Sequence, residues 1–275
     1  MKKYYRLIDE VRVNICIEDG IYNQEKDVFD CIFKSYSTCD SSKMSFRKEF
    51  YYHIQSSENL LENRLHYGMV CDVNSEQWIF LLISDLENFY LEILNCTVIH
   101  GSCVRINGKN ILIIGERWSG KTTLTYFLTI ENEGEYLSDD CIYIFNDKYI
   151  GLGMPLPMRD ITNTDSKYII ARTVDEEQQR RILFQPPRVI KSLSNIDMVI
   201  FPKYNPNAKN DIKKISCKEA FDNIILNVRA HCQLKSMFKD IIRLATKSDN
   251  YIIDYSDSPS AYYMLFGNHP DGCRR

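Results

Sequence analysis

One stretch near the middle of the chain has residue types and spacing suited to binding a phosphate chain. The pattern G-x-x-x-x-G-K-[ST] is matched by Gly115-Glu116-Arg117-Trp118-Ser119-Gly120-Lys121-Thr122. In such a loop, backbone N–H groups wrap around phosphate oxygens at the start of a helix, and glycine is needed where the loop turns. We expect Lys121 to supply charge to the phosphates, Thr122 a hydroxyl ligand to Mg²⁺, and Thr123 to continue the site into the helix. The alternative is a glycine-containing turn that only caps a helix.

Two adjacent carboxylates follow this stretch. Asp139 and Asp140 come eighteen residues or more after Lys121, within the apolar segment 136–145, which is predicted to be one strand. A carboxylate on a neighbouring strand can hold Mg²⁺ beside a phosphate loop, and a second one can take the proton of an attacking hydroxyl. Consecutive strand residues point to opposite faces, so the alternative is that one carboxylate is solvated and only the other is functional.

A histidine precedes the loop by fifteen residues. By spacing alone, His100 fits a structural residue better than an active-site residue. Ser119 fits a role in the conformation of the loop better than that of a nucleophile. The chain shows no Ser/His/Asp spacing of a hydrolase and no haem, flavin or dinucleotide fingerprint, so phosphate chemistry is the main expectation.

The elements that must position these residues are visible in the surrounding pattern. Val98–Ile106 and Asn110–Ile114 are predicted strands, and Asn107-Gly108 between them suits a type I′ turn, whose central residues both need positive φ. The second strand runs directly into the glycine-containing loop, and a helix is predicted over Lys121–Ile130. A strand, loop and helix in this order are the context that supports a phosphate loop.

The remaining pattern predicts an α/β fold with a mixed sheet. We expect a β-rich N-terminal part over 1–75, with the period-two strand Val11–Ile17, and a catalytic domain over 76–275 that begins with an amphipathic helix over Glu76–Cys96. The polar stretch 159–191 is predicted to be a long loop or lid. Further expected elements are a strand over 196–201, helices over 218–232 and 234–246, and a strand over 251–255.

Composition excludes several classes of partner. The net charge of −3, with basic and acidic residues mixed along 275 residues, gives no field suited to nucleic acid. No apolar run approaches the ~20 residues of a membrane span, and the start of the chain lacks the apolar region of a signal peptide. The ten cysteines form no C-x-x-C and no zinc spacing. We therefore expect reduced thiols in a cytoplasmic protein without membrane contact.

These motifs together resemble a known family. The matching residues are His100-Gly101-Ser102-Cys103-Val104, the Asn107-Gly108 turn, the loop Gly115–Thr122, and Leu137-Ser138-Asp139-Asp140. In order and spacing they resemble the active-site core of the HPr kinase/phosphorylase family, and in type its small relatives, the peptide-serine kinases of lasso-peptide and ribosomal-peptide tailoring clusters. The resemblance implies a P-loop kinase core akin to that of phosphoenolpyruvate carboxykinase, which uses ATP with Mg²⁺ to phosphorylate a serine hydroxyl.

The resemblance also implies residue roles. His100 would lie near the phosphates, and the two carboxylates would be the metal ligand and the base. We assign Asp139 to the metal with Thr122 and Asp140 to the base, and the reverse assignment of the two carboxylates stays open. Trp118 stands where the family has a glycine, and it could pack outward or cover a nucleotide ring. Arg159, which follows the segment 154–158, is a candidate contact to substrate or phosphate.

The expected function is an ATP- and Mg²⁺-dependent kinase that transfers the γ-phosphoryl group to a hydroxyl, serine above all, of a peptide or small protein. Ile150 stands where the bifunctional members of the family have an arginine before a glycine-rich signature, which favours the smaller kinases over a phosphorylase. The alternatives are a small-molecule kinase on the same core and a non-catalytic nucleotide-binding regulator. The sequence does not identify the acceptor, and a homo-oligomer is compatible with it.

Overall fold

The chain folds into two compact units. The computed structural model describes residues 1–38, 47–56, 66–159, 167–175, 177–230 and 232–267. The first unit comprises Met1–Ile93 and Pro157–Gln185, and the second comprises Leu94–Leu156 and Pro186–Arg275. The sequence-based boundary at residue 75 stays a prediction.

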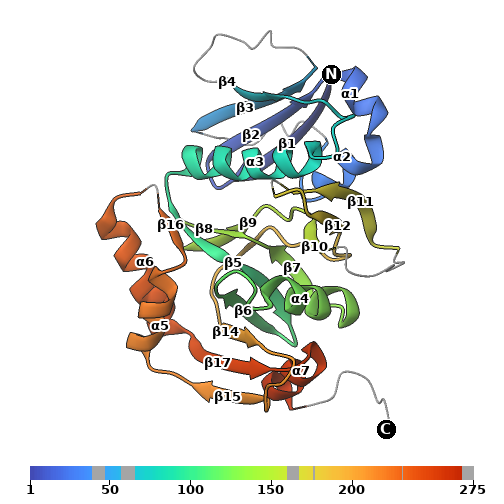
Figure 1. Cartoon of the computed structure of the whole chain (residues 1–275). Helices are drawn as coiled ribbons and strands as arrows, with labels where there is room; N and C mark the ends of the chain where they lie inside the picture. The colour runs from blue at the N-terminus through green and yellow to red at the C-terminus, as the bar shows by residue number, and fades with distance from the viewer. Residues whose placement is uncertain (39–46, 57–65, 160–166, 176, 231, 268–275) are drawn as a thin grey trace. The chain divides into compact units, whose positions relative to one another are not determined.

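The first unit contains a four-stranded sheet in the order β1-β2-β3-β4 (Figure 1). Its strands are β1 (Lys2–Ile8), β2 (Val11–Ile17), β3 (Lys48–Gln55) and β4 (His66–Val70), and its helices are α1 (Asp19–Gln24), α2 (Lys26–Ile32) and α3 (Trp78–Leu94). β2 runs antiparallel to β1 and parallel to β3. Leu82, Leu86 and Phe89 recur at three- and four-residue steps on α3 and are buried, and the Phe89 ring packs against Tyr52 of β3. The predicted strand and the predicted helix are thus both confirmed.

A second, smaller sheet in this unit corrects one expectation. The described part of the stretch 159–191 is not a long loop: it contains β11 (Ile169–Val174) and β12 (Arg180–Phe184), which pair with each other and lie in a sheet of order β10-β12-β11 with β10 (Leu156–Arg159). Residues 160–166 and 176 of the stretch lie outside the described residues. The turn between β11 and β12 is one of its polar segments. There Asp175 accepts hydrogen bonds from the backbone N–H groups of Glu177 and Gln179 and pairs with Arg181. The charged residues Asp175 and Arg181, which in the sequence suggest a solvated loop, therefore stabilise the turn between two paired strands.

The second unit is built on a mixed ten-stranded sheet, which confirms the α/β class. The strand order is β13-β9-β8-β5-β6-β14-β17-β15, and β7 and β16 also pair with β5. β6, β14 and β17 are parallel, whereas β5 runs antiparallel to β6. The strands are β5 (Thr97–Ile106), β6 (Lys109–Ile114), β7 (Glu135–Ser138), β8 (Cys141–Phe145), β9 (Lys148–Gly151), β13 (Ser192–Leu193), β14 (Met198–Tyr204), β15 (Asp211–Lys214), β16 (Val228–Ala230) and β17 (Asp249–Tyr255).

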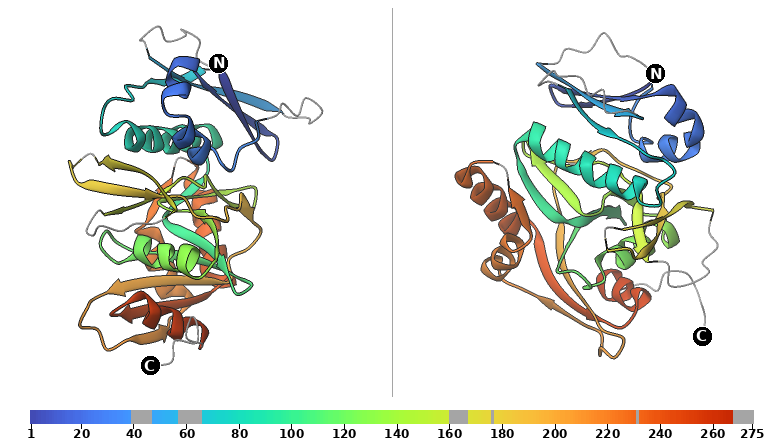
Figure 2. Two further views of the ribbon diagram at one scale, coloured as in Figure 1. Left: turned by 90° about the vertical axis from the view of Figure 1, so that its right-hand side faces the viewer. Right: turned by 45° about the horizontal axis from the view of Figure 1, so that its top comes forward.

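Helices cover both faces of this sheet (Figures 1 and 2). α4 (Lys121–Tyr126), its π-helical continuation Phe127–Glu131 and α7 (Ser258–Phe266) pack on one face, and α5 (Cys217–Ile225) and α6 (Leu234–Lys247) on the other. β6 shows why helices are needed on both faces. Its side chains alternate, so that Ile111 and Ile113 join the core under α4, while Leu112 and Ile114 join the core under α5 and α6. A strand that is apolar on both faces has to be buried on both.

The turn before β6 is confirmed, and one predicted helix is too long. Asn107 and Gly108 have φ values of 51° and 71°, as a type I′ turn requires. The helix expected over 218–232 ends at Ile225, because Val228–Ala230 pairs with β5 as strand β16. Local apolar spacing could not reveal this long-range pairing.

Two further observations concern the described part of the chain. No helix there is long and apolar enough to cross a membrane. Eight cysteines within the described ranges are free thiols, and five of these are buried. Cys39 and Cys273 lie outside those ranges.

Candidate functional site

The loop 115–120 connects the end of β6 to the start of α4, as the sequence predicts. Gly120 has φ 93°, in the left-handed region, and a Cβ there would overlap the Tyr255 hydroxyl. A Cβ at Gly115 would lie 2.7 Å from the Ser119 Oγ. Both pattern glycines are therefore required by the geometry, one through its φ and both through space.

Two neighbouring strands hold the loop in place. The Tyr204 N–H at the end of β14 donates to the Ser119 carbonyl (3.1 Å), and the Tyr255 hydroxyl at the end of β17 donates to the Gly120 carbonyl (3.2 Å). The Ser119 Oγ is buried inside the loop and has no hydrogen-bond partner among the described residues. An unpaired buried hydroxyl in a loop of backbone amides leaves hydrogen-bonding capacity for a ligand.

Lys121 lies inside the loop and not on its surface. Its side chain is 7% exposed, and Nζ donates to the carbonyls of Gly115 (2.7 Å) and Glu116 (3.0 Å). Burial lowers the pKa of Lys121, and the nearby Asp139 and Asp140 carboxylates oppose that shift. The ammonium is thus positioned at the centre of the loop by carbonyl oxygens.

The carboxylate pair does not lie within a continuous strand, which corrects the prediction for 136–145. β7 ends at Ser138 and β8 begins at Cys141, and Asp140 between them has φ 66°. The partner strand β5 keeps one register across the break, with Cys103 opposite Ser138 and His100 opposite Cys141. The break therefore leaves the sheet intact and changes only the directions of the two carboxylates, so the alternation of strand side chains does not apply to them.

Asp139 joins the break to the loop helix. Its Oδ2 accepts a hydrogen bond from the Thr122 hydroxyl (2.9 Å), and its Oδ1 accepts one from the Ser102 hydroxyl of β5. The residue is 4% exposed. Burial and the neighbouring Asp140 raise the pKa of Asp139 to about 7, against the opposing effects of the two hydroxyls and Lys121. A cation at this position would favour its ionised form.

Asp140 lies beside His100. The imidazole Nδ1 is 3.2 Å from the Asp140 carbonyl oxygen and 3.7 Å from its carboxylate Oδ1. Both neighbours are acceptors, so Nδ1 carries the proton and Nε2 keeps its lone pair. Burial lowers the pKa of His100, Lys121 and Arg229 lower it further, and Asp140 opposes them. The imidazole is therefore neutral at neutral pH.

Two residues near the site had no role in the sequence-based interpretation. Ser102 belongs to the motif around His100, and its hydroxyl bonds Asp139. Arg229 lies on β16, which pairs with β5 so that Val228 is opposite Ile99. Its guanidinium is 3.9 Å from the Cys141 Sγ, and its positive charge lowers the pKa of His100. Ser102 could have been found from its motif, whereas nothing local marks Arg229, because the pairing of β16 is long-range.

The remaining predicted residues lie at the surface or in the other unit. Glu116, Arg117 and Thr123 are exposed. Trp118 has φ 75°, is 59% exposed, and has the Arg117 guanidinium 5.9 Å from its ring centre. Arg159 ends β10 and belongs to the first unit, and its contact with a substrate stays a prediction.

The donor chemistry of the site suits a hard cation and a phosphate chain. Across the described ranges, no group of three or more His, Cys, Asp or Glu side chains could hold a metal ion. Thr122 and Asp139 offer two adjacent oxygen donors. Mg²⁺ is usually held by one or two protein oxygens, with water and substrate phosphates completing its shell, so this pair fits Mg²⁺ beside a bound nucleotide.

Comparison with known proteins adds little to this geometry. No family model matches the chain, and no curated protein matches it. Among solved structures, the chain is similar to the Hpr(Ser) kinase/phosphatase from Coxiella burnetii, at 18% identity and a TM-score of 0.24, over 42% of this chain and 70% of that one. A likeness of this size carries no conclusion about function, which has to rest on the site.

Proposed function

We propose that this protein is a kinase that uses ATP and Mg²⁺ to phosphorylate a hydroxyl group, serine above all, of a peptide or small protein. The observation that carries the proposal is the 2.9 Å hydrogen bond from Thr122 to Asp139. It brings the hydroxyl of the loop helix and a buried carboxylate together, next to a loop whose glycines and lysine suit a triphosphate. This arrangement supports phosphoryl transfer better than binding alone, because Asp140 adds a second carboxylate.

Three groups of the loop would bind the nucleotide phosphates. The loop 115–120 leads into the start of α4, where backbone N–H groups favour anions. Lys121 Nζ would exchange its bonds to the Gly115 and Glu116 carbonyls for phosphate oxygens without leaving the loop. The unpaired Ser119 Oγ offers a further donor.

Thr122 and Asp139 would hold Mg²⁺, and the ion would supply positive charge against the negative charge that develops during transfer. Ser102 would not contact the metal itself but bonds its ligand Asp139. Its hydroxyl occupies Oδ1 of Asp139 and so directs Oδ2 toward Thr122. Such orientation of a metal ligand by an outer hydrogen bond supports its affinity.

Asp140 would take the proton of the acceptor. Its carboxylate is 43% exposed, so an acceptor hydroxyl can reach it, while His100 lies against its inner side. The hydroxyl oxygen forms a bond to the γ-phosphorus, the bond to the ADP oxygen breaks, and the hydroxyl proton moves to Asp140. His100 positions Asp140 through its Nδ1 proton.

A panel of acceptors tests this proposal. Purified protein is incubated with ATP, Mg²⁺ and serine-containing peptides, their serine-to-alanine counterparts, free sugars and free amino acids, and the products are weighed by mass spectrometry. We expect one added phosphate on serine peptides and none on the alanine peptides. Lys121→Met should abolish the transfer, and Asp222→Asn, an exposed carboxylate change on α5, should not affect it. Phosphate on free sugars or amino acids alone would favour a small-molecule kinase.

A further inference from the structure

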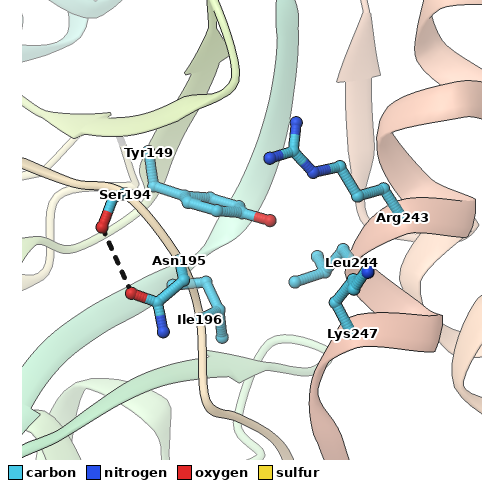
Figure 3. Close-up of a pocket in the computed structure, with 7 residues that line it drawn as sticks. All are labelled: Tyr149, Ser194, Asn195, Ile196, Arg243, Leu244 and Lys247. Atoms are coloured by element: carbon cyan, nitrogen blue, oxygen red, sulfur yellow. Dashed lines mark hydrogen bonds between the residues drawn. The ribbon is translucent and has the colours of Figure 1, made fainter.

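A pocket of about 290 Å³ lies in the second unit, near the C-terminal end of α6 (Figure 3). Its walls come from three segments that are distant in sequence: the β8–β9 hairpin with Tyr149, the segment 194–196 before β14, and the last turns of α6 with Arg243, Leu244 and Lys247. Its volume is close to the lower limit of small-molecule sites, ~300 Å³.

The pocket combines an apolar floor with a cationic side. Ile196, Leu244 and the ring of Tyr149 are buried members of the core under α6. Arg243 and Lys247 stand one helical turn apart on α6 and line the same space, and Figure 3 shows the Tyr149 hydroxyl pointing across it toward α6. Burial raises the pKa of Tyr149 to about 12, although Arg243 opposes the shift, so the hydroxyl keeps its proton and can donate.

The two cations are not fully compensated. Arg243 pairs with Asp147, and both side chains are substantially exposed, so the ion pair is weak and an added anion can share the guanidinium. Lys247 makes no ion pair with any residue that the structure describes. The pocket therefore presents one uncompensated ammonium, one shared guanidinium and one phenol donor above an apolar surface.

This pocket is separate from the candidate kinase site. Segment 194–196 precedes β14, and Asn195 accepts a hydrogen bond from Asn110 at the start of β6. The loop 115–120 lies at the other end of β6, which has six residues and so spans ~20 Å. Parallel strands place their reaction sites at their carboxyl ends, so a pocket at the opposite ends is not a continuation of that site.

We propose that this pocket binds a small organic anion, in which one carboxylate or phosphate group is carried on a short apolar body. The anionic group would contact Lys247, Arg243 and the Tyr149 hydroxyl, and the apolar body would lie on Ile196 and Leu244. A bare inorganic anion lacks the apolar contact with Ile196 and Leu244. A neutral analogue lacks the charged contact with Lys247 and Arg243. This inference does not depend on the proposed kinase activity.

Calorimetric titration with four probes tests it: benzoate, phenyl phosphate, inorganic phosphate and benzyl alcohol. We expect saturable binding of benzoate or phenyl phosphate, with the tighter one identifying the anionic group, and at least tenfold weaker binding of the other two probes. Lys247→Gln should lower the affinity for the organic anion about tenfold. Lys239→Gln, on the same helix and exposed but outside the pocket, is the matched control and should have no effect.

A second set of titrations distinguishes binding in this pocket from binding at the loop 115–120. Titration is repeated with Lys121→Met and with wild-type protein saturated with tripolyphosphate, and the organic anion should bind both as it binds the free wild type. Three results would overturn the proposal: no saturable binding of either organic anion, equal affinity for inorganic phosphate and phenyl phosphate, or unchanged affinity in Lys247→Gln. None of them bears on phosphoryl transfer.

Discussion

Asp139 is a buried carboxyl group whose polar neighbours act on its charge in opposite directions. Burial and Asp140 favour the protonated form, while Thr122, Ser102 and Lys121 favour the ionised form, and the balance raises its pKa to about 7. In the unfolded chain its pKa is ordinary, near 4. The folded protein without metal therefore binds a proton at Asp139 over a pH range in which the unfolded chain has released it.

A pH dependence of stability follows, and its sign is the reverse of the usual carboxylate case. Because the folded pKa is raised, the contribution of Asp139 is fully present below pH 4 and is lost as pH rises through 7, at up to ~1.4 kcal/mol per pH unit. Urea unfolding of wild type and Asp139→Asn between pH 5 and pH 8, with a chelator present, should show wild type losing stability relative to the variant. Parallel profiles would contradict the raised pKa.

Trp118 provides an optical signal at the loop. The chain has two tryptophans, and Trp78 is buried in the first unit whereas Trp118 is 59% exposed on the loop. If its ring covers the nucleotide base, ATP should quench the emission of Trp118 and tripolyphosphate should quench it far less. Trp118→Phe is the control and should remove the response. Equal quenching by both ligands would mean that the ring packs outward and does not contact the base.

At the scale of elements, Gly120 is the more constrained of the two glycines at the junction from β6 to α4. Gly120 combines a φ of 93° with a Cβ position already occupied by the Tyr255 hydroxyl. Gly108, in the turn before β6, also has positive φ but has open space around its Cβ position. Comparing substitutions at Gly108 and Gly120 therefore distinguishes the cost of a positive φ from the cost of steric overlap.

Gly120→Ala should destabilise the protein more than Gly108→Ala. Both changes carry the ~1 kcal/mol cost of positive φ, and Gly120→Ala adds the displacement of Tyr255, about 1–2 kcal/mol more. Urea unfolding measures both values, and titration with ATP should show lost affinity for Gly120→Ala alone. Equal destabilisation with retained ATP binding would argue against this geometry of the loop.

The hairpin of β11 and β12 depends on a buried carboxylate at its turn. Burial alone would raise the pKa of Asp175, but bonds from the Gln179 and Glu177 amides and the Arg181 guanidinium outweigh it and lower the pKa. A lowered folded pKa gives stability that is present above the unfolded value and is lost as pH falls through the folded one.

Asp175→Asn should therefore cost about 2 kcal/mol at pH 7, and the difference from wild type should shrink as pH falls below 4. Chemical unfolding at pH 7 and pH 3 measures it. Glu177→Gln, an exposed change in the same turn, is the control and should be nearly neutral. A constant difference at both pH values would mean that the carboxylate charge is not what stabilises the turn.

Elements with strong local signals could be predicted from the sequence, and those defined by distant partners could not. The Asn107-Gly108 turn, the apolar run of β6 and the spacing of α3 each follow from neighbouring residues. The break at Asp139 and Asp140 was missed because a non-glycine residue at positive φ is stable there only within the β5 pairing. Arg229 was missed because β16 meets β5 across more than a hundred residues.

At the scale of the whole second unit, the sheet separates two kinds of site. The loop and the carboxylates lie at the carboxyl ends of the parallel strands, and the cationic pocket lies at the opposite ends. The α/β class alone would not indicate either of them, since such sheets support many functions. The proposed function therefore depends on particular side chains: Asp139 as a metal ligand and Asp140 as the proton acceptor of a hydroxyl.

The most direct test is phosphate transfer from ATP to a serine peptide by wild type, Asp139→Asn and Asp140→Asn, measured as the mass of the peptide over time with Mg²⁺ present. We expect one added phosphate with wild type and rates at least a hundredfold lower with either variant, while both variants remain folded. Full activity of Asp140→Asn, or no transfer by wild type to any hydroxyl, would contradict it.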